Sequence, residues 1–183
     1  MNWTIPGTVL QASRQEADRI EDVFSSMFLG GGIVLSQVSA ITGLEPYTVQ
    51  NWVKRGFLVP PVRKRYTLRQ LCRIININML KAALPMEEIC GLLGYINGHL
   101  NDESDDLIDD SQLYFLFVKL AADPQKREDP AWLKAQLESY QEPVPGARER
   151  VETVLGIMLT AWGAAQLRLR ALDMVQQLKS EKE

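Results

Sequence analysis

The sequence has little of the chemistry on which most enzymes and metal sites depend. It contains two cysteines, Cys72 and Cys90, and one histidine, His99. The cysteines form no CxxC pair and have no neighbouring histidine, so the sequence offers neither zinc-ligand spacing nor a dithiol motif. Each cysteine falls on the apolar side of an expected helix, where a free thiol packs as a small hydrophobic group. We therefore expect no metal, no cofactor and no disulfide.

Catalytic groups and long hydrophobic runs are also scarce. The sequence has no Ser-His-Asp set and no pair of carboxylates in an apolar setting, and Gly30-Gly31-Gly32 lacks the lysine and the strand of a phosphate-binding loop. No apolar run approaches the roughly 20 residues of a membrane span. The N-terminus lacks the basic residues followed by an apolar core that are typical of a secretory signal. These absences predict a cytoplasmic protein that is not an enzyme and has no membrane partner.

Positive charge is concentrated in one segment of an acidic chain. The whole chain carries a formal charge of −3. Residues 33–82 contain eight Lys or Arg residues and one acid, Glu45, so this segment carries 8 − 1 = +7. Residues 83–122 contain eight acids and one base, Lys119, and carry 1 − 8 = −7. Clustered cations favour the binding of phosphate groups, as in DNA. The acidic stretch 101–110 predicts a solvated loop at a boundary between two parts of the chain.

The N-terminal part of the chain predicts a single helix. Residues 1–12 show no periodicity and predict an extended arm. Ser13 with Glu16 forms a capping box, and the apolar residues that follow have helical spacing as far as Phe28. The three glycines at 30–32 end this helix.

Two short helices joined at Gly43 follow in the basic segment. Ser36 is the expected N-cap of the first, and the second begins with Pro46 and ends at Gly56. Trp52 is expected to fill the core behind the second helix. The opposite face carries hydroxyl, amide and basic side chains, the types that contact base edges and phosphates in DNA. They are Tyr47, Thr48, Gln50, Asn51, Lys54 and Arg55.

A basic strip and two further helices complete this segment. Pro60 and Pro61 exclude a helix, so the run Arg63-Lys64-Arg65 predicts an exposed tip between extended segments. Thr67 with Gln70 forms a capping box for the next helix, and another helix begins near residue 85.

The C-terminal part predicts helices only, the last of them covering roughly residues 147–179. Apolar residues along that helix alternate spacings of four and three, as in a coiled-coil seam. The seam is either a dimer contact or the core-facing side of the helix. Its candidate dimerisation residues are Val151, Leu155, Met158, Trp162, Leu169 and Leu172. A small-molecule effector also stays open, because the aromatic residues here either line a pocket or fill the core. They are Tyr114, Phe115, Phe117, Trp132, Tyr140 and Trp162.

Three stretches carry a resemblance to a known family. The run from Leu44 to Val53 is followed by Lys54-Arg55-Gly56-Phe57-Leu58, Tyr66 and Thr67 close the basic strip, and Leu84-Pro85-Met86-Glu87-Glu88-Ile89 opens a later helix. They resemble the MerR-like winged helix-turn-helix of bacterial transcription regulators. The chain departs from that pattern at Gln50, where the family has arginine, and in a shorter basic strip. The C-terminal part is similar to uncharacterised proteins, mostly of Gram-positive bacteria, that join such a head to a helical domain of unknown function.

The sequence therefore predicts a mainly α fold in three parts. These are an N-terminal arm and helix at 1–32, a MerR-like winged helix-turn-helix at 33–95, and an all-α dimerisation or effector domain with a long terminal helix at 106–183. The predicted function is that of a dimeric, sequence-specific transcriptional regulator that binds double-stranded DNA. The alternative is a protein-interaction module that uses the same fold without binding DNA. The residues expected to contact DNA are Ser36, Tyr47, Thr48, Gln50, Asn51, Lys54, Arg55, Arg63, Lys64, Arg65, Tyr66 and Arg69.

Overall fold

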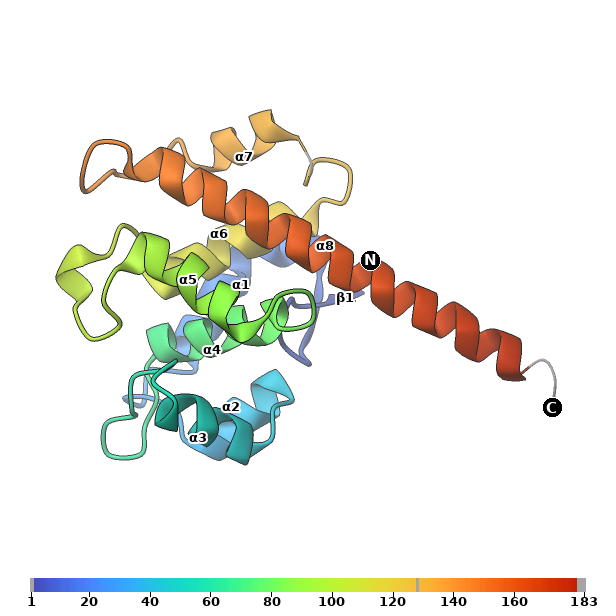
Figure 1. Ribbon diagram of the computed structural model, residues 1–183, viewed down its shortest axis with the longest axis horizontal. Helices are drawn as coiled ribbons and strands as arrows, with labels where there is room; N and C mark the ends of the chain where they lie inside the picture. The colour runs from blue at the N-terminus through green and yellow to red at the C-terminus, as the bar shows by residue number, and fades with distance from the viewer. Residues whose placement is uncertain (1, 128, 181–183) are drawn as a thin grey trace.

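The computed structural model describes residues 2–127 and 129–180, which are mainly helical (Figure 1). This confirms the predicted fold class at the level of a mainly α protein. Its elements are two strands, β1 (Asn2–Thr4) and β2 (Gln11–Ser13), and the 3-10 helices η1 (Arg14–Arg19) and η2 (Glu103–Asp105). The α-helices are α1 (Ile20–Ser26), α2 (Leu35–Thr42), α3 (Pro46–Lys54), α4 (Leu68–Leu80), α5 (Met86–Asn97), α6 (Asp110–Ala122), α7 (Pro130–Gln136) and α8 (Ala147–Ser180).

Gly43 and Pro46 determine where α2 ends and where α3 begins. Gly43 adopts a left-handed conformation with φ of 70° after α2, and its N–H donates to the carbonyl of Ser39. Pro46 occupies the first turn of α3, where its missing N–H would have no helical partner. The expected N-cap at Ser36 is wrong by two residues. The cap is Val34, and the Gln37 side chain accepts from its N–H at 2.9 Å.

Helix α4 is the centre of one continuous hydrophobic core. Every residue from Leu71 to Ile77 is buried, including Arg73 and Asn76, and α4 packs mainly on α6. Buried hydrophobic residues from α2, α3, α4, α6 and α8 form a single cluster. Buried residues on both sides of residues 95–105 belong to this cluster, so the hydrophobic core is continuous across the expected boundary.

The N-terminal segment is an integral part of this core and not an extended arm. Strands β1 and β2 form an antiparallel hairpin that buries Trp3 and Ile5. The Tyr114 hydroxyl donates to the carbonyl of Pro6 at 3.0 Å. The helix expected from residue 13 is divided into η1 and α1, and Ser13 caps η1 by accepting from Gln15 N–H. Sequence periodicity could not reveal the contact between Tyr114 and Pro6, because these two residues are far apart in the chain.

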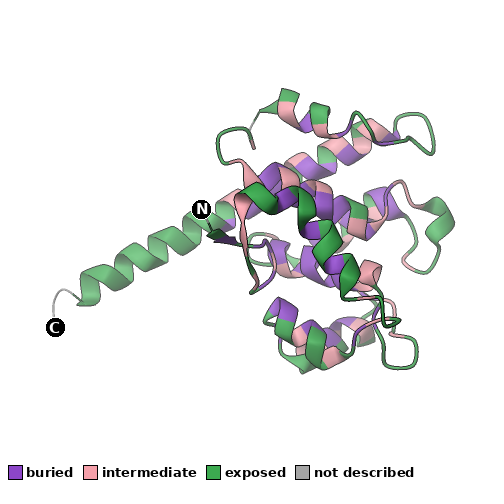
Figure 2. Cartoon of the chain, turned by 180° about the vertical axis from the view of Figure 1, so that it is seen from behind, coloured by how far each residue is buried: buried purple, intermediate pink, exposed green. Residues whose placement is uncertain are grey.

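Helix α8 consists of two halves with different environments. Figure 2 shows buried residues along the first half and an exposed second half that projects from the body. Four residues expected at a dimer contact are instead buried in the core of their own chain: Val151, Leu155, Met158 and Trp162. Leu169 and Leu172 lie on the projecting half and are 52% and 49% exposed.

Most aromatic residues of the C-terminal part fill the core, but Trp132 is half-buried and lines an open pocket with Arg14 and Lys119. Tyr114, Phe115 and Phe117 are buried, and the Phe117 and Trp162 rings pack edge to face with centroids 5.9 Å apart. The Phe24 ring packs edge to face on Phe115, with centroids 5.8 Å apart, and so joins α1 to α6. None of the helices in the described residues has the length and apolar character needed to cross a membrane.

Candidate nucleic-acid interface

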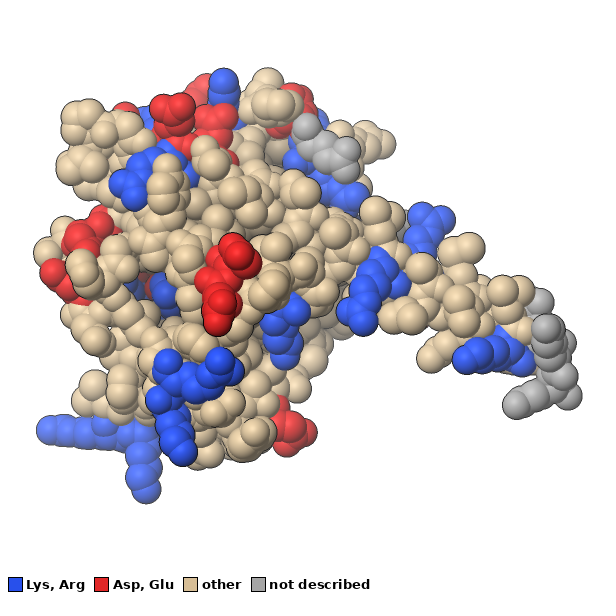
Figure 3. All heavy atoms as spheres, in the orientation of Figure 1, with Lys and Arg blue, Asp and Glu red and all other residues tan. Residues whose placement is uncertain are grey.

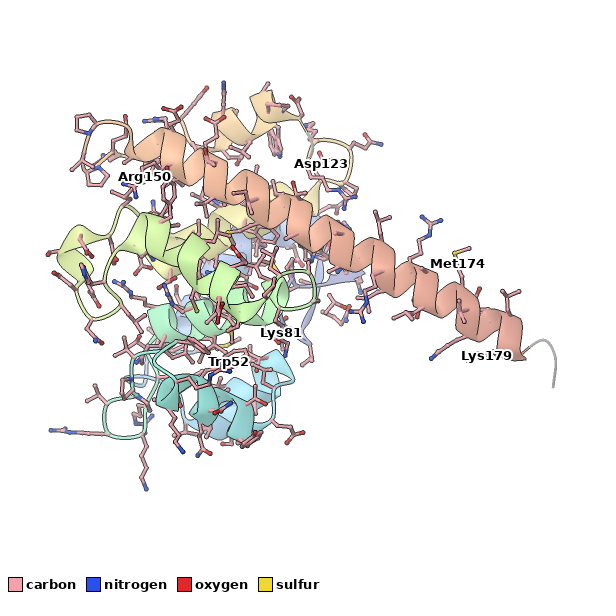
Figure 4. All side chains as sticks on the ribbon, in the orientation of Figure 1. Trp52, Lys81, Asp123, Arg150, Met174 and Lys179 are labelled. Carbon is pink, nitrogen blue, oxygen red and sulfur yellow. The ribbon has the colours of Figure 1, made fainter. Side chains whose placement is uncertain are left out.

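Helix α3 has a buried apolar face and an exposed polar face. Val49 is fully buried and Trp52 is 5% exposed, which confirms the prediction that Trp52 lies in the core. The Lys81 ammonium lies 5.7 Å from the centroid of the Trp52 ring, and burial lowers the pKa of Lys81 (Figure 4). The outward face carries Tyr47, Gln50, Lys54 and Arg55, which are exposed, and Thr48 and Asn51, which are half-buried.

Aromatic packing orients one cation of this face. The Arg55 guanidinium lies 4.6 Å from the centroid of the Phe57 ring. An arginine placed over an aromatic face loses some of its conformational freedom. Arg55 is therefore held at the end of α3 with its side chain still exposed.

The basic strip folds into a tight hairpin turn. Val62 and Arg65 form an antiparallel bridge, so Arg63 and Lys64 are the two central residues of the turn. Both have positive φ, 50° and 62°, a left-handed conformation that costs ordinary side chains energy and that hairpin turns of this kind require. Both side chains are exposed. The two cations are thus displayed at the tip of the hairpin at the expense of local strain.

Neighbouring segments fix the base of the hairpin. Ile33 pairs with Tyr66 through two backbone hydrogen bonds, and Arg65 donates to the carbonyl of Gly32 at 2.8 Å. Gly32 has φ of 104°, and a Cβ there would lie 2.9 Å from the Tyr66 carbonyl oxygen, so this position requires glycine. Gln70 donates to the carbonyl of Val59 at 3.1 Å. The sequence pattern alone gives Gly32 no role in the hairpin and predicts only helix capping for Gln70.

The hairpin, α2 and α3 meet around an open hollow of about 570 Å³. Ser36 from α2, Gln50 from α3 and Lys64 from the turn all line it. The structure thus brings together residues that are up to 28 positions apart (64 − 36 = 28). Figure 3 shows Lys and Arg side chains gathered around this end of the molecule, with most acidic side chains elsewhere on the visible face.

Two residues of the predicted interface do not present exposed, unpaired side chains there. Tyr66 is only 3% exposed, and burial raises the pKa of its phenol, so it is a core residue and not a surface contact. Arg69 turns toward the acidic segment, where its Nη2 lies 2.5 Å from Asp106 Oδ2 and its Nε 3.7 Å from Asp109 Oδ2. Its charge is therefore neutralised within the chain.

The acidic segment packs on α4, so the prediction of a solvated loop holds only for its first half. Residues 101–105 are exposed, but Asp110 is 2% exposed and its Oδ1 lies 3.4 Å from Arg73 Nη1. Burial raises the pKa of Asp110 to about 6, and the nearby charge of Arg73 opposes that rise. Among residues 2–127 and 129–180, no group of three or more His, Cys, Asp or Glu residues is arranged to hold a metal ion.

Comparisons with known proteins give a family but no activity. Residues 20–117 match the family described as a domain of unknown function, DUF1836. The match starts at the first residue of α1 and ends within α6, so it crosses the acidic segment. The chain is 25% identical over 114 residues to the "Uncharacterized protein YkrK" of Bacillus subtilis (strain 168), which covers 60% of this chain and 49% of that protein. The chain thus spans about half the length of that curated relative. No solved structure gives a significant match.

Proposed function

The chain belongs to the DUF1836 family, and we propose that it is a dimeric, sequence-specific DNA-binding regulator of transcription. In this proposal α2, the turn at Gly43 and α3 form a helix-turn-helix, and the hairpin that follows is its wing. Helix α3 enters the major groove of the DNA. The hairpin tip contacts the neighbouring phosphates and sets the register of the protein on the duplex.

One observation carries the proposal: α3 and the hairpin display cations and base-reading side chains on adjacent surfaces. Gln50 and Asn51 provide amides of the kind that pair with adenine edges, while Arg63 and Lys64 provide charges for phosphates. Of the eight basic residues in segment 33–82, Arg69 and Arg73 are paired with acids and Lys81 lies over the Trp52 ring, which leaves five exposed cations on this surface. They are Lys54, Arg55, Arg63, Lys64 and Arg65.

The first test separates phosphate contacts from base contacts. We expect the protein to bind duplex DNA with a strong dependence on salt. Arg63→Ala and Lys64→Ala should each weaken binding to all sequences about equally and lower the salt slope by about 1. Lys134→Ala on α7, which lies at the opposite end of the molecule, removes the same charge and should leave binding unchanged (Figure 1). Absence of binding to any duplex at low salt would exclude this function.

The second test concerns sequence preference. Gln50→Ala or Asn51→Ala should relax the preference at one or two base positions, with a loss of about 1–3 kcal/mol of discrimination there. Selection of bound fragments from a random duplex pool measures this preference for each variant. If both variants keep the full preference of the parent protein, α3 is not the element that reads bases.

A protein-interaction module is the second candidate, and two exposed apolar residues favour it. Tyr47 on α3 and Val62 beside the hairpin tip are each 73% exposed. Exposed apolar side chains are common anchors of protein interfaces. Salt-dependent binding to random duplex DNA separates the two functions, because a protein-docking surface does not require it.

A further inference from the structure

The projecting half of α8 is the largest concentration of exposed apolar residues in the described part of the chain. Six of its side chains are between 48% and 66% exposed, and they are Leu167, Leu169, Leu172, Met174, Val175 and Leu178. No residue from 166 to 180 is buried. An isolated helix of this length is only marginally stable in water. A partner that covers the apolar residues would stabilise it.

These apolar residues form two stripes, and only one of them leads to a vacant surface. Leu169 and Leu172 continue the face of α8 that is buried in the body, where their own chain already covers it. Leu167, Met174 and Leu178 lie on another face, because spacings of seven and four bring residues back to one side of a helix. In the body, that second face forms one wall of an open groove between α7 and α8.

The groove is lined by small residues of α8 at the same helical spacing. Gly156, Thr160 and Gly163 face it, and it ends at Leu167, where the apolar stripe begins. A Cβ at Gly156 or Gly163 would meet no atom within 4 Å, so packing within the chain does not require glycine there. Glycine inside a helix lowers helix stability relative to alanine. The absence of side chains leaves room for a close approach by another molecule.

We propose that the projecting half of α8 pairs antiparallel with α8 of a second copy of this chain, so that each apolar stripe fills the other copy's groove. The proposal deepens the dimer of the proposed function and rests on it. A two-fold axis at Leu167 gives the register. Leu178 of one copy then lies opposite Gly156 of the other, eleven residues from Leu167 on either side. Met174 lies opposite Thr160, so large side chains meet small ones.

Charge complementarity also favours the projecting half of α8 from a second copy as the segment that fills the groove. Residues 166–180 contain Arg168, Arg170 and Lys179 and one acid, Asp173, so the projecting half carries 3 − 1 = +2. The charged residues that line the groove are Arg127, Asp129 and Glu152, with a sum of 1 − 2 = −1. In the antiparallel register, Lys179 of one copy lies within one turn of Glu152 of the other. The paired stretch, residues 156–178, is about 34 Å long.

Sedimentation of the full chain without DNA tests the proposal. The parent protein should be a dimer. The double variant Met174→Glu/Leu178→Glu should be a monomer with an unchanged circular dichroism spectrum, because both side chains are exposed in the single chain. Gly156→Trp should also give a monomer, because it fills the groove.

The matched control Leu169→Glu/Leu172→Glu places the same charges on the other stripe and should remain a dimer. A monomeric parent, or a control that alone dissociates, would overturn the proposal.

Cross-linking tests the orientation of the two helices. With Cys90→Ser as background, Leu167→Cys should give a covalent dimer with a short thiol–thiol reagent, since Leu167 lies at the two-fold axis. Leu178→Cys should give none, because the two copies of that position would be about 33 Å apart. Efficient linkage through position 178 would indicate parallel helices and refute the antiparallel pairing. Because neither experiment uses DNA, failure of the dimer and failure of DNA binding remain distinguishable.

Discussion

Two residues at the hairpin tip combine an unfavourable backbone with exposed positive charge. Arg63 and Lys64 have φ of 50° and 62°, where glycine and asparagine are favoured over long side chains. Strained residues of this kind concentrate at functional surfaces, because folding alone would select against them. The strain at this turn therefore supports a role for the two side chains outside the folding of the chain.

Replacement of the tip separates stability from binding. The double variant Arg63→Asn/Lys64→Gly supplies residues suited to the turn and should raise the free energy of unfolding by about 1 kcal/mol. The same variant should bind DNA more weakly, because two cations are lost. Denaturant unfolding and a duplex-binding titration on one preparation measure both effects. A variant that is less stable than the parent would show that Arg63 and Lys64 make stabilising contacts at the turn.

The buried carboxyl of Asp110 gives the protein a defined pH dependence. Its pKa rises from 3.8 to about 6 in the folded protein, chiefly because burial disfavours the charged form. The folded state therefore holds this proton more tightly than the unfolded state does. The resulting stabilisation is fully present below pH about 4 and is lost as the pH rises through about 6, by about 3 kcal/mol in total.

Asp110→Asn isolates this contribution, because the amide does not ionise. The parent and the variant should have similar stability near pH 4, and the variant should be more stable by up to about 3 kcal/mol above pH about 6. Chemical unfolding at a series of pH values measures the difference between them. A variant that becomes relatively less stable as the pH rises would mean that attraction to Arg73 outweighs the cost of burial.

At the scale of elements, the sequence predicted best where local chemistry decides the structure. Gly43, Pro46 and the capping box of Thr67 with Gln70 correctly marked the boundaries of α2, α3 and α4, because each acts on neighbouring backbone groups. Local sequence signals gave wrong predictions where contacts between residues far apart in the chain determine the structure. The alternation that predicted a dimer seam along α8 is the same for a core-facing helix, so spacing alone could not assign its first half to the core.

The candidate interface follows the same rule. Residue types predicted the exposed face of α3 and the exposed hairpin tip, and the structure places them side by side. The sequence predicts Tyr66 and Arg69 at the interface, since both lie next to the basic strip in the chain. Their true environments are set by the backbone pairing with Ile33 and by the carboxylate of Asp106, which lies 37 positions beyond Arg69 (106 − 69 = 37). Such partners cannot be inferred from one sequence by periodicity.

At the scale of the whole molecule, the continuous core predicts that the segment 33–95 depends on the rest of the chain for its stability. Helix α4 contacts α2, which in turn contacts α3, and it packs most extensively on α6. A fragment of residues 33–95 would lose the cover of α6, which contacts α4, and of the N-terminal segment, whose Gly7 lies against the buried Ile75. Exposed apolar area of this kind costs about 25 cal/mol per Å². We therefore expect the fragment not to fold.

Circular dichroism and thermal unfolding of the fragment check this expectation. The fragment should have low helicity and no cooperative transition, whereas a fragment of residues 2–180 should unfold in one transition, because its buried residues form one cluster. Cooperative unfolding of residues 33–95 alone would establish an independent domain and contradict the single-core description.

The N-terminal hairpin has a consequence for how the chain folds. Trp3 packs against Trp162, Tyr114 donates to Pro6, and Arg14 donates to the carbonyl of Ala122. During synthesis, the residues of this hairpin leave the ribosome long before α6 and α8 exist. Their native contacts cannot form until residues more than 100 positions further along the chain have been synthesised. Most helical proteins fold rapidly through local contacts, but closure of such long loops slows the final step. The hairpin should therefore be the last segment to become ordered, and its docking should set the rate at which the native protein appears.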